Sequence, residues 1–234
     1  MSAQPYFFHA VWDHLLRVLH WWNAITLFSQ IITGSIILIF GSEIHGGMKD
    51  NLVNVHSISG YMFAAGVLTR ILWLFIGPPT ARWRDLLPLT SSQRKVFMDT
   101  LRYYASALRK VPPLYLAHNP FAGIIYSIFF LAACAQVVTG VVMLNLPEEL
   151  RSKSPLLIWH DAFYYFMIFY VVAHLFAVFI HELVERHGLI SAMVHGSKTF
   201  KEEEWQRLAA STELPHKGGD VDRKEYHASG SEQN

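Results

Sequence analysis

The segment WHDAFYYFMIFYVVAHLFAVFIHE, residues 159–182, is long and apolar enough to cross a membrane, yet it carries three histidines. An α-helix turns about 100° and rises about 1.5 Å per residue, so His160 and His174 lie nearly on one face and about 21 Å apart along the axis. His181 extends the same stripe. Ionisable side chains inside a membrane span are costly and mark functional positions. The segment therefore predicts a membrane helix with a function arranged along one face.

The composition also indicates a membrane protein. Of the 234 residues, 52% are apolar and only 16% are charged, which is too few charges for a soluble domain of this size. About 20 mainly apolar residues are needed to cross a hydrocarbon layer of roughly 30 Å. Four segments meet that requirement: residues 15–40, 53–76, 121–146 and 156–183. We expect an all-α, integral membrane four-helix bundle whose first segment is a span rather than a cleaved signal peptide.

The basic residues predict the orientation of the bundle, because Lys and Arg concentrate in cytoplasmic loops. The loop after the first span holds only Lys49, and the loop after the third holds Arg151 and Lys153. The segment between the second and third spans holds Arg82, Arg84, Arg94, Lys95, Arg102, Arg109 and Lys110. We expect this segment and both termini to be cytoplasmic. Topology explains the basic residues, so the net charge of +1 indicates no nucleic-acid partner.

Four histidines inside the spans fall at two depths. His56, in NVHSISGY, and His160 lie roughly one turn below the outer surface, in the second and fourth spans. His20, in RVLHWW, lies about 20 residues, or about 30 Å, from the outer end of the first span, which is the level of His174. The pairs His56 with His160 and His20 with His174 therefore each join the fourth span to a different neighbour. Two pairs of imidazoles between helices are typical of two haems b with two axial histidines each.

Residues around the pairs fit this interpretation. Gly60 lies one turn after His56 on the same face, where a glycine lets a flat macrocycle approach the backbone. Arg70 lies at the level of the inner pair and Arg17 lies one turn before His20, so either could pair with a haem propionate. For Arg17 an equal alternative is that its side chain extends to the lipid headgroups.

Other roles for the histidines stay open. A lone intramembrane histidine can instead bond to a neighbouring helix, and a stripe such as Phe163, Phe166 and Tyr170 is usually packing. A zinc site is disfavoured, because the pairs lie too far apart to converge on one ion and neither contains a carboxylate or thiolate. The single cysteine, Cys134, excludes an intrachain disulfide and the C-x-x-C-H attachment of c-type haem.

Polar residues also gather at the cytoplasmic ends of the third and fourth spans. In AHNP, Asn119 can cap the third span and Pro120 suits its first turn, while His118 could handle protons beside a quinone. His181 and Glu182 lie at the same boundary, where charged residues also anchor helix ends. We treat His118, Asn119, His181 and Glu182 as candidate quinone-site residues.

The order of these motifs resembles a known family. Over about residues 12–200 the chain carries RVLHWWN, VHSISGYMFAAGVLTRILW, AHNP, the two histidines of the fourth span and ISAMVHG. Together they resemble the b-type cytochrome subunit of membrane-bound nickel–iron hydrogenases, within the bacterial cytochrome b561 and formate dehydrogenase gamma-like di-haem cytochromes. The cytochrome subunits of formate dehydrogenase and related reductases share the four-helix plan more loosely.

The resemblance implies a multi-pass protein of the bacterial inner membrane that is not itself catalytic for hydrogen. It would anchor a periplasmic hydrogenase through the small iron–sulphur subunit, and through that subunit the large nickel–iron subunit. By motif, the outer of two non-covalent haems b would be held by His56 and His160, and the inner one by the other pair. The H-N-P element at His118 would lie near the quinone, menaquinone or ubiquinone, that accepts the electrons.

Three alternatives remain at this stage. The same cytochrome could serve a formate dehydrogenase or a thiosulphate-type reductase, and the copurifying iron–sulphur subunit would distinguish these. A haem or metal transporter would use the histidines as a path, and a structural anchor would be colourless. In each case we expect the membrane domain to cover residues 1–200 and a cytoplasmic tail, partly disordered after a short surface helix in TFKEEEWQRLAAS, to cover residues 201–234.

Overall fold

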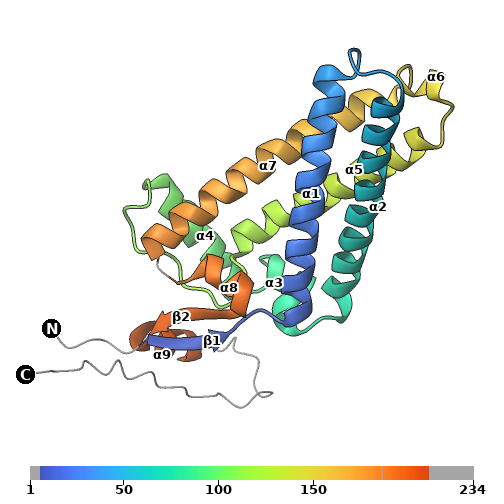
Figure 1. The fold of residues 1–234 in the computed structure, drawn as a ribbon. Helices are drawn as coiled ribbons and strands as arrows, with labels where there is room; N and C mark the ends of the chain where they lie inside the picture. Colours follow the sequence, from blue (N-terminus) through green and yellow to red (C-terminus); the bar gives the residue numbers. More distant parts are fainter. Residues whose placement is uncertain (1–5, 186, 211–234) are drawn as a thin grey trace, which may run out of the picture.

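Four long helices form the body of the protein. The structure is a computed structural model that describes residues 6–185 and 187–210. The long helices are α1 (His14–Phe40), α2 (Gly47–Ile76), α5 (Pro120–Leu144) and α7 (Leu156–Glu185). All four are long and apolar enough to cross a membrane, and Figure 1 shows them as one bundle. The prediction of an all-α membrane four-helix bundle is confirmed.

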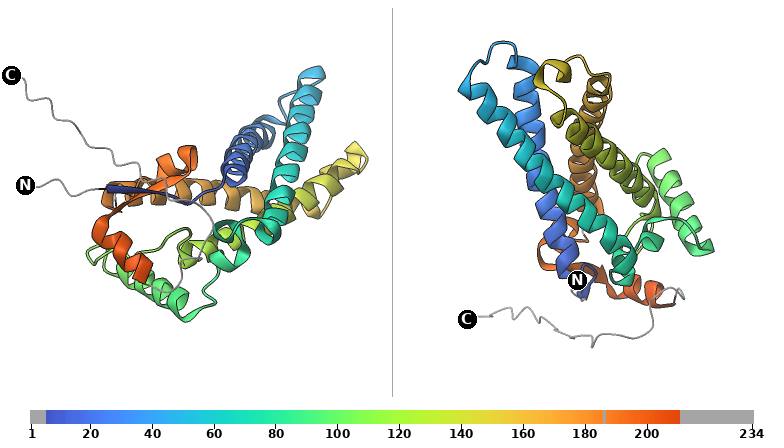
Figure 2. Two further views of the ribbon diagram at one scale, coloured as in Figure 1. Left: turned by 90° about the horizontal axis from the view of Figure 1, so that it is seen from below. Right: turned by 90° about the vertical axis from the view of Figure 1, so that its right-hand side faces the viewer.

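The bundle consists of two helix pairs. Helix α1 packs along α2, α5 packs along α7, and contacts of α2 with α5 and of α1 with α7 join the pairs. Figures 1 and 2 show that the α5–α7 pair is inclined to the α1–α2 pair. One end of the bundle carries the α1–α2 turn and the short helix α6 (Glu148–Arg151). We call it the turn end.

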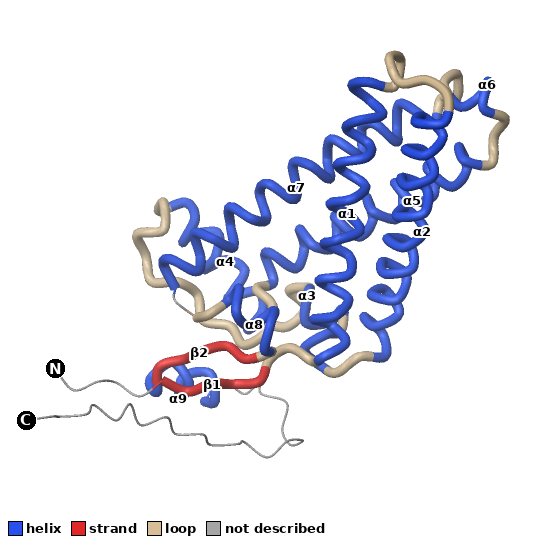
Figure 3. The backbone as a smooth tube through the Cα atoms, viewed as in Figure 1, coloured by secondary structure: helices blue, strands red, loops and turns tan. Residues whose placement is uncertain are grey.

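The opposite end carries a two-stranded ribbon that the sequence analysis did not predict. Strand β1 (Tyr6–Ala10) pairs antiparallel with β2 (Ser197–Lys201), as the red segments of Figure 3 show. Helix α8 (Leu189–His195) precedes β2 and α9 (Glu202–Ala210) follows it. We call this the ribbon end. The ribbon joins the first described residues to a segment almost 200 positions later in the chain.

The tail was predicted in part. Helix α9 confirms the short helix expected in TFKEEEWQRLAAS. The expected domain boundary between residues 200 and 201 lies within β2. The segment after the helix, expected to be disordered, lies outside the described residues.

Side-chain caps determine where two of the spans, α1 and α5, begin. An α-helix leaves its first backbone N–H groups without internal partners. At α1 the carboxylate of Asp13 accepts from the Leu16 N–H at 3.0 Å. At α5 the side chain of Asn119 accepts from the Phe121 N–H at 2.9 Å, and Pro120 opens the helix. The capping role predicted for Asn119 and Pro120 is confirmed.

The segment between α2 and α5 folds back against the ribbon end. It contains η1 (Pro79–Ala81), α3 (Trp83–Leu86) and α4 (Ser91–Ala105). Both α3 and α4 contact α5. Residues of this segment therefore pack against the first turns of α5, next to the quinone candidates His118 and Asn119.

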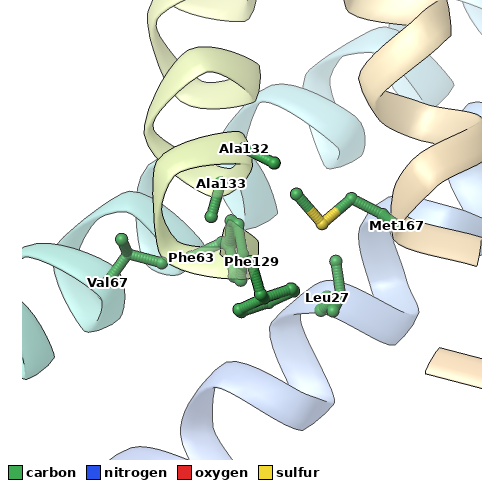
Figure 4. Close-up of a cluster of buried hydrophobic side chains, with 7 residues drawn as sticks. All are labelled: Leu27, Phe63, Val67, Phe129, Ala132, Ala133 and Met167. Carbon is green, nitrogen blue, oxygen red and sulfur yellow. The ribbon is translucent and has the colours of Figure 1, made fainter. Parts of the chain in front are cut away.

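The main hydrophobic core lies near the middle of the bundle, and all four spans contribute to it. Figure 4 shows its buried side chains, which are Leu27, Phe63, Val67, Phe129, Ala132, Ala133 and Met167. Leu27 lies on α1, Met167 on α7 and the others on α2 and α5. This core holds the two helix pairs together.

We predict that Gly123→Ala destabilises the fold, because a Cβ at Gly123 would collide with the main-chain carbonyl of Leu86 in α3. Overpacking of this kind costs about 1–3 kcal/mol. Thermal unfolding of the detergent-solubilised protein, followed by circular dichroism, would measure the loss. The matched control is Gly47→Ala in the first turn of α2, where no described atom lies within 4 Å of the new Cβ. Equal melting temperatures of the two variants would contradict this packing.

Candidate functional site

The structure brings His56 of α2 and His160 of α7 together near the turn end. Their ring centroids lie 6.5 Å apart and their planes are inclined by 74°. Thr33 Oγ1 of α1 lies 2.8 Å from His56 Nδ1, and Thr139 Oγ1 of α5 lies 3.0 Å from His160 Nδ1. We call these two histidines the distal pair, because they lie far from the ribbon.

His20 of α1 and His174 of α7 form a second pair nearer the ribbon end, the proximal pair. Their ring centroids lie 6.4 Å apart at an interplanar angle of 49°. Tyr170 stacks on His174 at 5.8 Å with its plane inclined by only 9°. The buried Nδ1 of His20 has no hydrogen-bond partner among the residues that the structure describes.

Both separations fit one metal between two imidazoles. A histidine nitrogen binds a metal at about 2 Å and lies roughly 1 Å from its ring centre, so two imidazoles on opposite sides of one ion have centroids about 6 Å apart. The measured values are 6.4 and 6.5 Å. A closed zinc site needs four ligands, and no group of three or more His, Cys, Asp and Glu side chains within the described ranges could hold a metal. The donor set fits a haem iron, whose other four ligands come from the porphyrin.

The hydrophobic core separates the two pairs. Met167 is seven residues from each histidine of α7, and Phe63 is seven residues after His56, so the core lies about 10 Å along the helices from each pair. The bundle therefore contains two distinct histidine sites with an apolar layer between them.

The residues predicted to surround the pairs have other contacts. Arg70, which is 6% exposed, donates from Nη1 to the carbonyl of Ala81 at 3.1 Å. Arg17 Nη1 donates to the carbonyl of Val194 in α8. A Cβ at Gly60 would face the amide of Gln30 on α1, so this glycine makes room for Gln30. The glycines that lie against the distal imidazoles are Gly34 and Gly140, and the sequence analysis did not identify them.

His118 and Asn119 lie in a buried polar network at the start of α5. His118 Nδ1 donates to Asp85 Oδ2 at 2.6 Å, and Asn119 Nδ2 donates to Thr100 Oγ1 of α4 at 3.0 Å. Burial lowers the pKa of His118, although the bond to Asp85 opposes that shift. The His118 ring lies 6.0 Å from that of Tyr126, centroid to centroid. Asp85, Thr100 and Tyr126 carry no motif that the sequence analysis could have used.

His181 forms a second network at the ribbon-side end of α7. Its Nδ1 donates to Glu185 Oε1 at 2.7 Å, and its Nε2 accepts from the Tyr104 hydroxyl at 2.8 Å. The pKa of Tyr104 is raised to about 12, chiefly by burial and also by the negative charge of Glu185. Glu182 lies apart from this network, because it accepts from the Ile190 N–H at the start of α8. The structure thus separates Glu182 from the other quinone candidates.

A buried lysine ties the ribbon to these networks. Lys198 of β2 is 2% exposed, and its Nζ donates to the carbonyls of Leu116 and Ala117 at 3.0 and 2.9 Å. The ammonium also lies 4.6 Å from the ring centre of Tyr115. Burial lowers the pKa of Lys198 to about 8, against the opposing charges of Glu185 and Asp85. The ribbon therefore fixes the loop that carries His118.

We predict that the buried Lys198 makes the stability depend on pH. Its folded pKa of about 8 lies below the ordinary 10.5, so in that window the unfolded chain binds more protons and stability rises with pH. Between these two pKa values the free energy of unfolding rises by about 3 kcal/mol, at about 1.4 kcal/mol per pKa unit. Denaturant titrations between pH 7 and 11 would measure the rise in the natural chain and its loss in Lys198→Met. Identical pH profiles for the two proteins would contradict it.

Comparison with known proteins identifies the family of the chain. The sequence model of the prokaryotic cytochrome b561 family matches residues 11–196. A relative from Cupriavidus necator is 28% identical over 82% of this chain and 87% of its own length, and one from Bradyrhizobium diazoefficiens is 26% identical over 82% and 86%. Both are named "Probable Ni/Fe-hydrogenase B-type cytochrome subunit". An Escherichia coli K12 protein, named "Probable Ni/Fe-hydrogenase 1 B-type cytochrome subunit", is 21% identical over 82% and 92%. The chain belongs to the prokaryotic cytochrome b561 family of integral membrane b-type cytochromes.

Proposed function

We propose that this chain is the di-haem membrane subunit of a nickel–iron hydrogenase and passes electrons from the enzyme to a quinone. One observation carries the proposal: two imidazole pairs at a metal-bridging separation lie at two levels of one membrane helix. Family membership supports haem b as the cofactor. The names of the relatives support a hydrogenase as the partner.

In this proposal the distal pair, His56 and His160, holds one haem, and the proximal pair, His20 and His174, holds the other. A bound haem b would supply one-electron transfer, and iron with two axial imidazoles has no open position for substrate. The protein positions the two imidazoles of each pair on different rigid helices and keeps the space between the pairs apolar. His160 and His174 on one helix would hold the two haems at fixed levels, about 21 Å apart along α7.

The positive-inside pattern supports an orientation with the ribbon end in the cytoplasm and the turn end outside. Arg82, Arg84, Arg94, Lys95 and Arg102 lie in the segment that packs at the ribbon end. The distal pair would then face the periplasmic iron–sulphur subunit of the hydrogenase. Through that subunit the large nickel–iron subunit would be anchored to the inner membrane.

We place quinone reduction at the ribbon end, beside the proximal pair. A quinone that accepts two electrons must also bind two protons to become a quinol. Three of the residues that we predict for the quinone site, His118, Asn119 and His181, have side-chain hydrogen bonds there, which supports this location. A string of neighbouring polar side chains leads from the surface to this region. In order, they are Glu204, His187, Glu185, His181 and Tyr104.

Two steps of this string are ion-pair distances rather than hydrogen bonds, so a proton would cross them through a bridging water or by rotation of the His187 ring. His187 Nε2 lies 3.5 Å from Glu204 Oε2, and its Nδ1 lies 3.8 Å from Glu185 Oε2. The side chain of Glu204 is 28% exposed, whereas that of Glu185 is 1% exposed. A proton from the cytoplasm could enter at Glu204 and reach Tyr104 through the buried carboxylate. Reduction driven from outside would then charge the membrane.

The alternatives make different predictions. A formate dehydrogenase or thiosulphate-type partner would copurify with its own iron–sulphur subunit instead of that of a hydrogenase. A haem or metal transporter would need a continuous polar path, and the apolar core around Met167 disfavours one. A purely structural anchor would bind no haem and would be colourless.

We predict that removing one member of a pair removes one haem. His56→Ala or His160→Ala should abolish one component of the optical redox titration and one low-spin EPR signal, and His20→Ala or His174→Ala should abolish the other. Each substitution would remove one of the two imidazoles that hold the iron of its pair. The matched control is His45→Ala, whose side chain lies in the exposed α1–α2 turn.

The pattern across these variants is the decisive result. Both components should survive in the His45 variant. If the His56 and His20 variants lost the same component, the proposed pairing would be wrong. If every variant kept both components, the four histidines would not be the ligands.

We also predict that Glu185→Gln slows quinone reduction by the hydrogenase complex about tenfold or more, because a proton-transferring group typically contributes at least that factor. Reduction of the haems by dithionite should be unchanged, since this reaction needs no quinone. Glu182→Gln is the matched control, three residues earlier on the same helix and bonded to α8. Equal rates for the two variants would remove Glu185 and His181 from the proposed site.

A further inference from the structure

The two helix pairs hold the distal histidines in the same way. The first span contains QIITG at residues 30–34 and the third contains QVVTG at residues 136–140. In each, the threonine bonds to the histidine of the following span, Thr33 to His56 and Thr139 to His160. This duplicated Q-x-x-T-G element was not identified from the sequence alone.

The glycine of each element makes the contact possible. A Cβ at Gly34 would lie 3.5 Å from His56 Cε1, and a Cβ at Gly140 would lie 3.1 Å from His160 Cε1. The second distance is tighter than ordinary van der Waals contact. Each imidazole therefore lies directly against the backbone of the neighbouring helix, within reach of the threonine before the glycine.

The bonding of the threonines determines which imidazole nitrogen carries the proton. A hydroxyl has one hydrogen to donate. Thr33 Oγ1 donates it to the Ser29 carbonyl at 2.7 Å, and Thr139 Oγ1 to the Ala135 carbonyl at 2.9 Å, one turn earlier in each helix. Towards the histidines the two hydroxyls can then only accept. From this bonding pattern we assign the hydrogen to Nδ1 in both imidazoles, which leaves the lone pair on Nε2.

The contact of Gln136 agrees with this tautomer. Its side-chain Nε2 lies 3.2 Å from His160 Nε2, and an amide N–H can only donate. With the amide in this orientation, the nitrogen that it meets is the one with the lone pair. Both distal imidazoles are thus prepared to bind a metal through Nε2.

We propose that Thr33 and Thr139 are positioning residues that fix both distal imidazoles in the Nε2-binding tautomer and lower the reduction potential of the distal haem. The proposal rests on the proposed function and deepens it. An acceptor at Nδ1–H makes the imidazole a stronger donor to its metal, which favours the oxidised iron. Hydrogen bonding behind the axial ligands is one of the means by which a protein sets a haem potential.

The proximal pair lacks this arrangement. The buried Nδ1 of His20 meets no acceptor in the described part of the chain, and the face of the His174 ring stacks on Tyr170. Because His20 lacks an acceptor of this kind, we expect hydrogen bonding behind the ligands to lower the distal potential more than the proximal one. A lower reduction potential at the distal haem than at the proximal haem favours electron transfer from the distal to the proximal site.

Thr33→Val and Thr139→Val test the proposal, because valine keeps the shape of threonine and removes the acceptor. The matched control is Thr26→Val on α1. Thr26 is also buried, 4% exposed, and its hydroxyl donates to the Trp22 carbonyl at 2.8 Å, so it makes the same bond within its helix. No hydrogen bond joins Thr26 to a histidine in the described structure. Thr33→Ser and Thr139→Ser restore the hydroxyl.

Redox titration of the purified chain gives the first result. The lower-potential component should shift upwards in Thr33→Val and Thr139→Val, shift most in the double variant, and return towards its original value in the serine variants. The other component and the Thr26→Val protein should not shift. Two haems per chain with unshifted potentials in the valine variants would overturn the inference and leave the proposed function standing. A chain without haem would overturn the proposed function instead.

A second measurement covers variants that lose haem. Nitrogen-15 NMR of histidine-labelled apoprotein distinguishes the two imidazole tautomers. The natural chain should show His56 and His160 with the hydrogen on Nδ1. In Thr33→Val, His56 should lose its preference for this tautomer and His160 should keep it. Nε2-protonated distal histidines in the natural chain would overturn the inference whether or not haem binds.

Discussion

Two imidazoles project from one rigid helix, and the other histidine-bearing helices are arranged around them. His160 and His174 are four turns apart on α7, so they point to one side of that helix at two fixed levels. Each level needs a partner at about 6.5 Å, and α2 and α1 supply His56 and His20. The apolar core between the levels keeps the two sites separate. The relative positions of α1, α2 and α7 follow from these requirements, and α5 packs along α7.

Much of this arrangement could be predicted from the sequence. A membrane span has a required length and a helix has a constant rise, so span limits and histidine depths follow from residue numbers alone. The observed helices end within a few residues of the predicted spans, apart from the longer start of α2. Local signals were equally reliable where the partner is close in sequence, as with the Asn119 cap.

Contacts between distant segments could not be predicted in this way. Strand β1 pairs with residues almost 200 positions later, and Lys198 reaches carbonyls of the loop before α5. The depth of a residue in the membrane also does not tell which neighbour its side of the helix faces. For this reason the contact of Gly60 with Gln30 and the bond of Glu182 to α8 were not predicted. The repeated Q-x-x-T-G was visible in the sequence, but its meaning depends on knowing that each threonine meets a histidine of the next span.

We propose that three helices hold two haems through four histidines. A pyridine haemochrome assay on the purified natural chain, combined with an accurate protein concentration, would count these haems. We expect two extractable protohaems per polypeptide, both low-spin before extraction. A colourless protein, or one haem per chain at full occupancy, would contradict it.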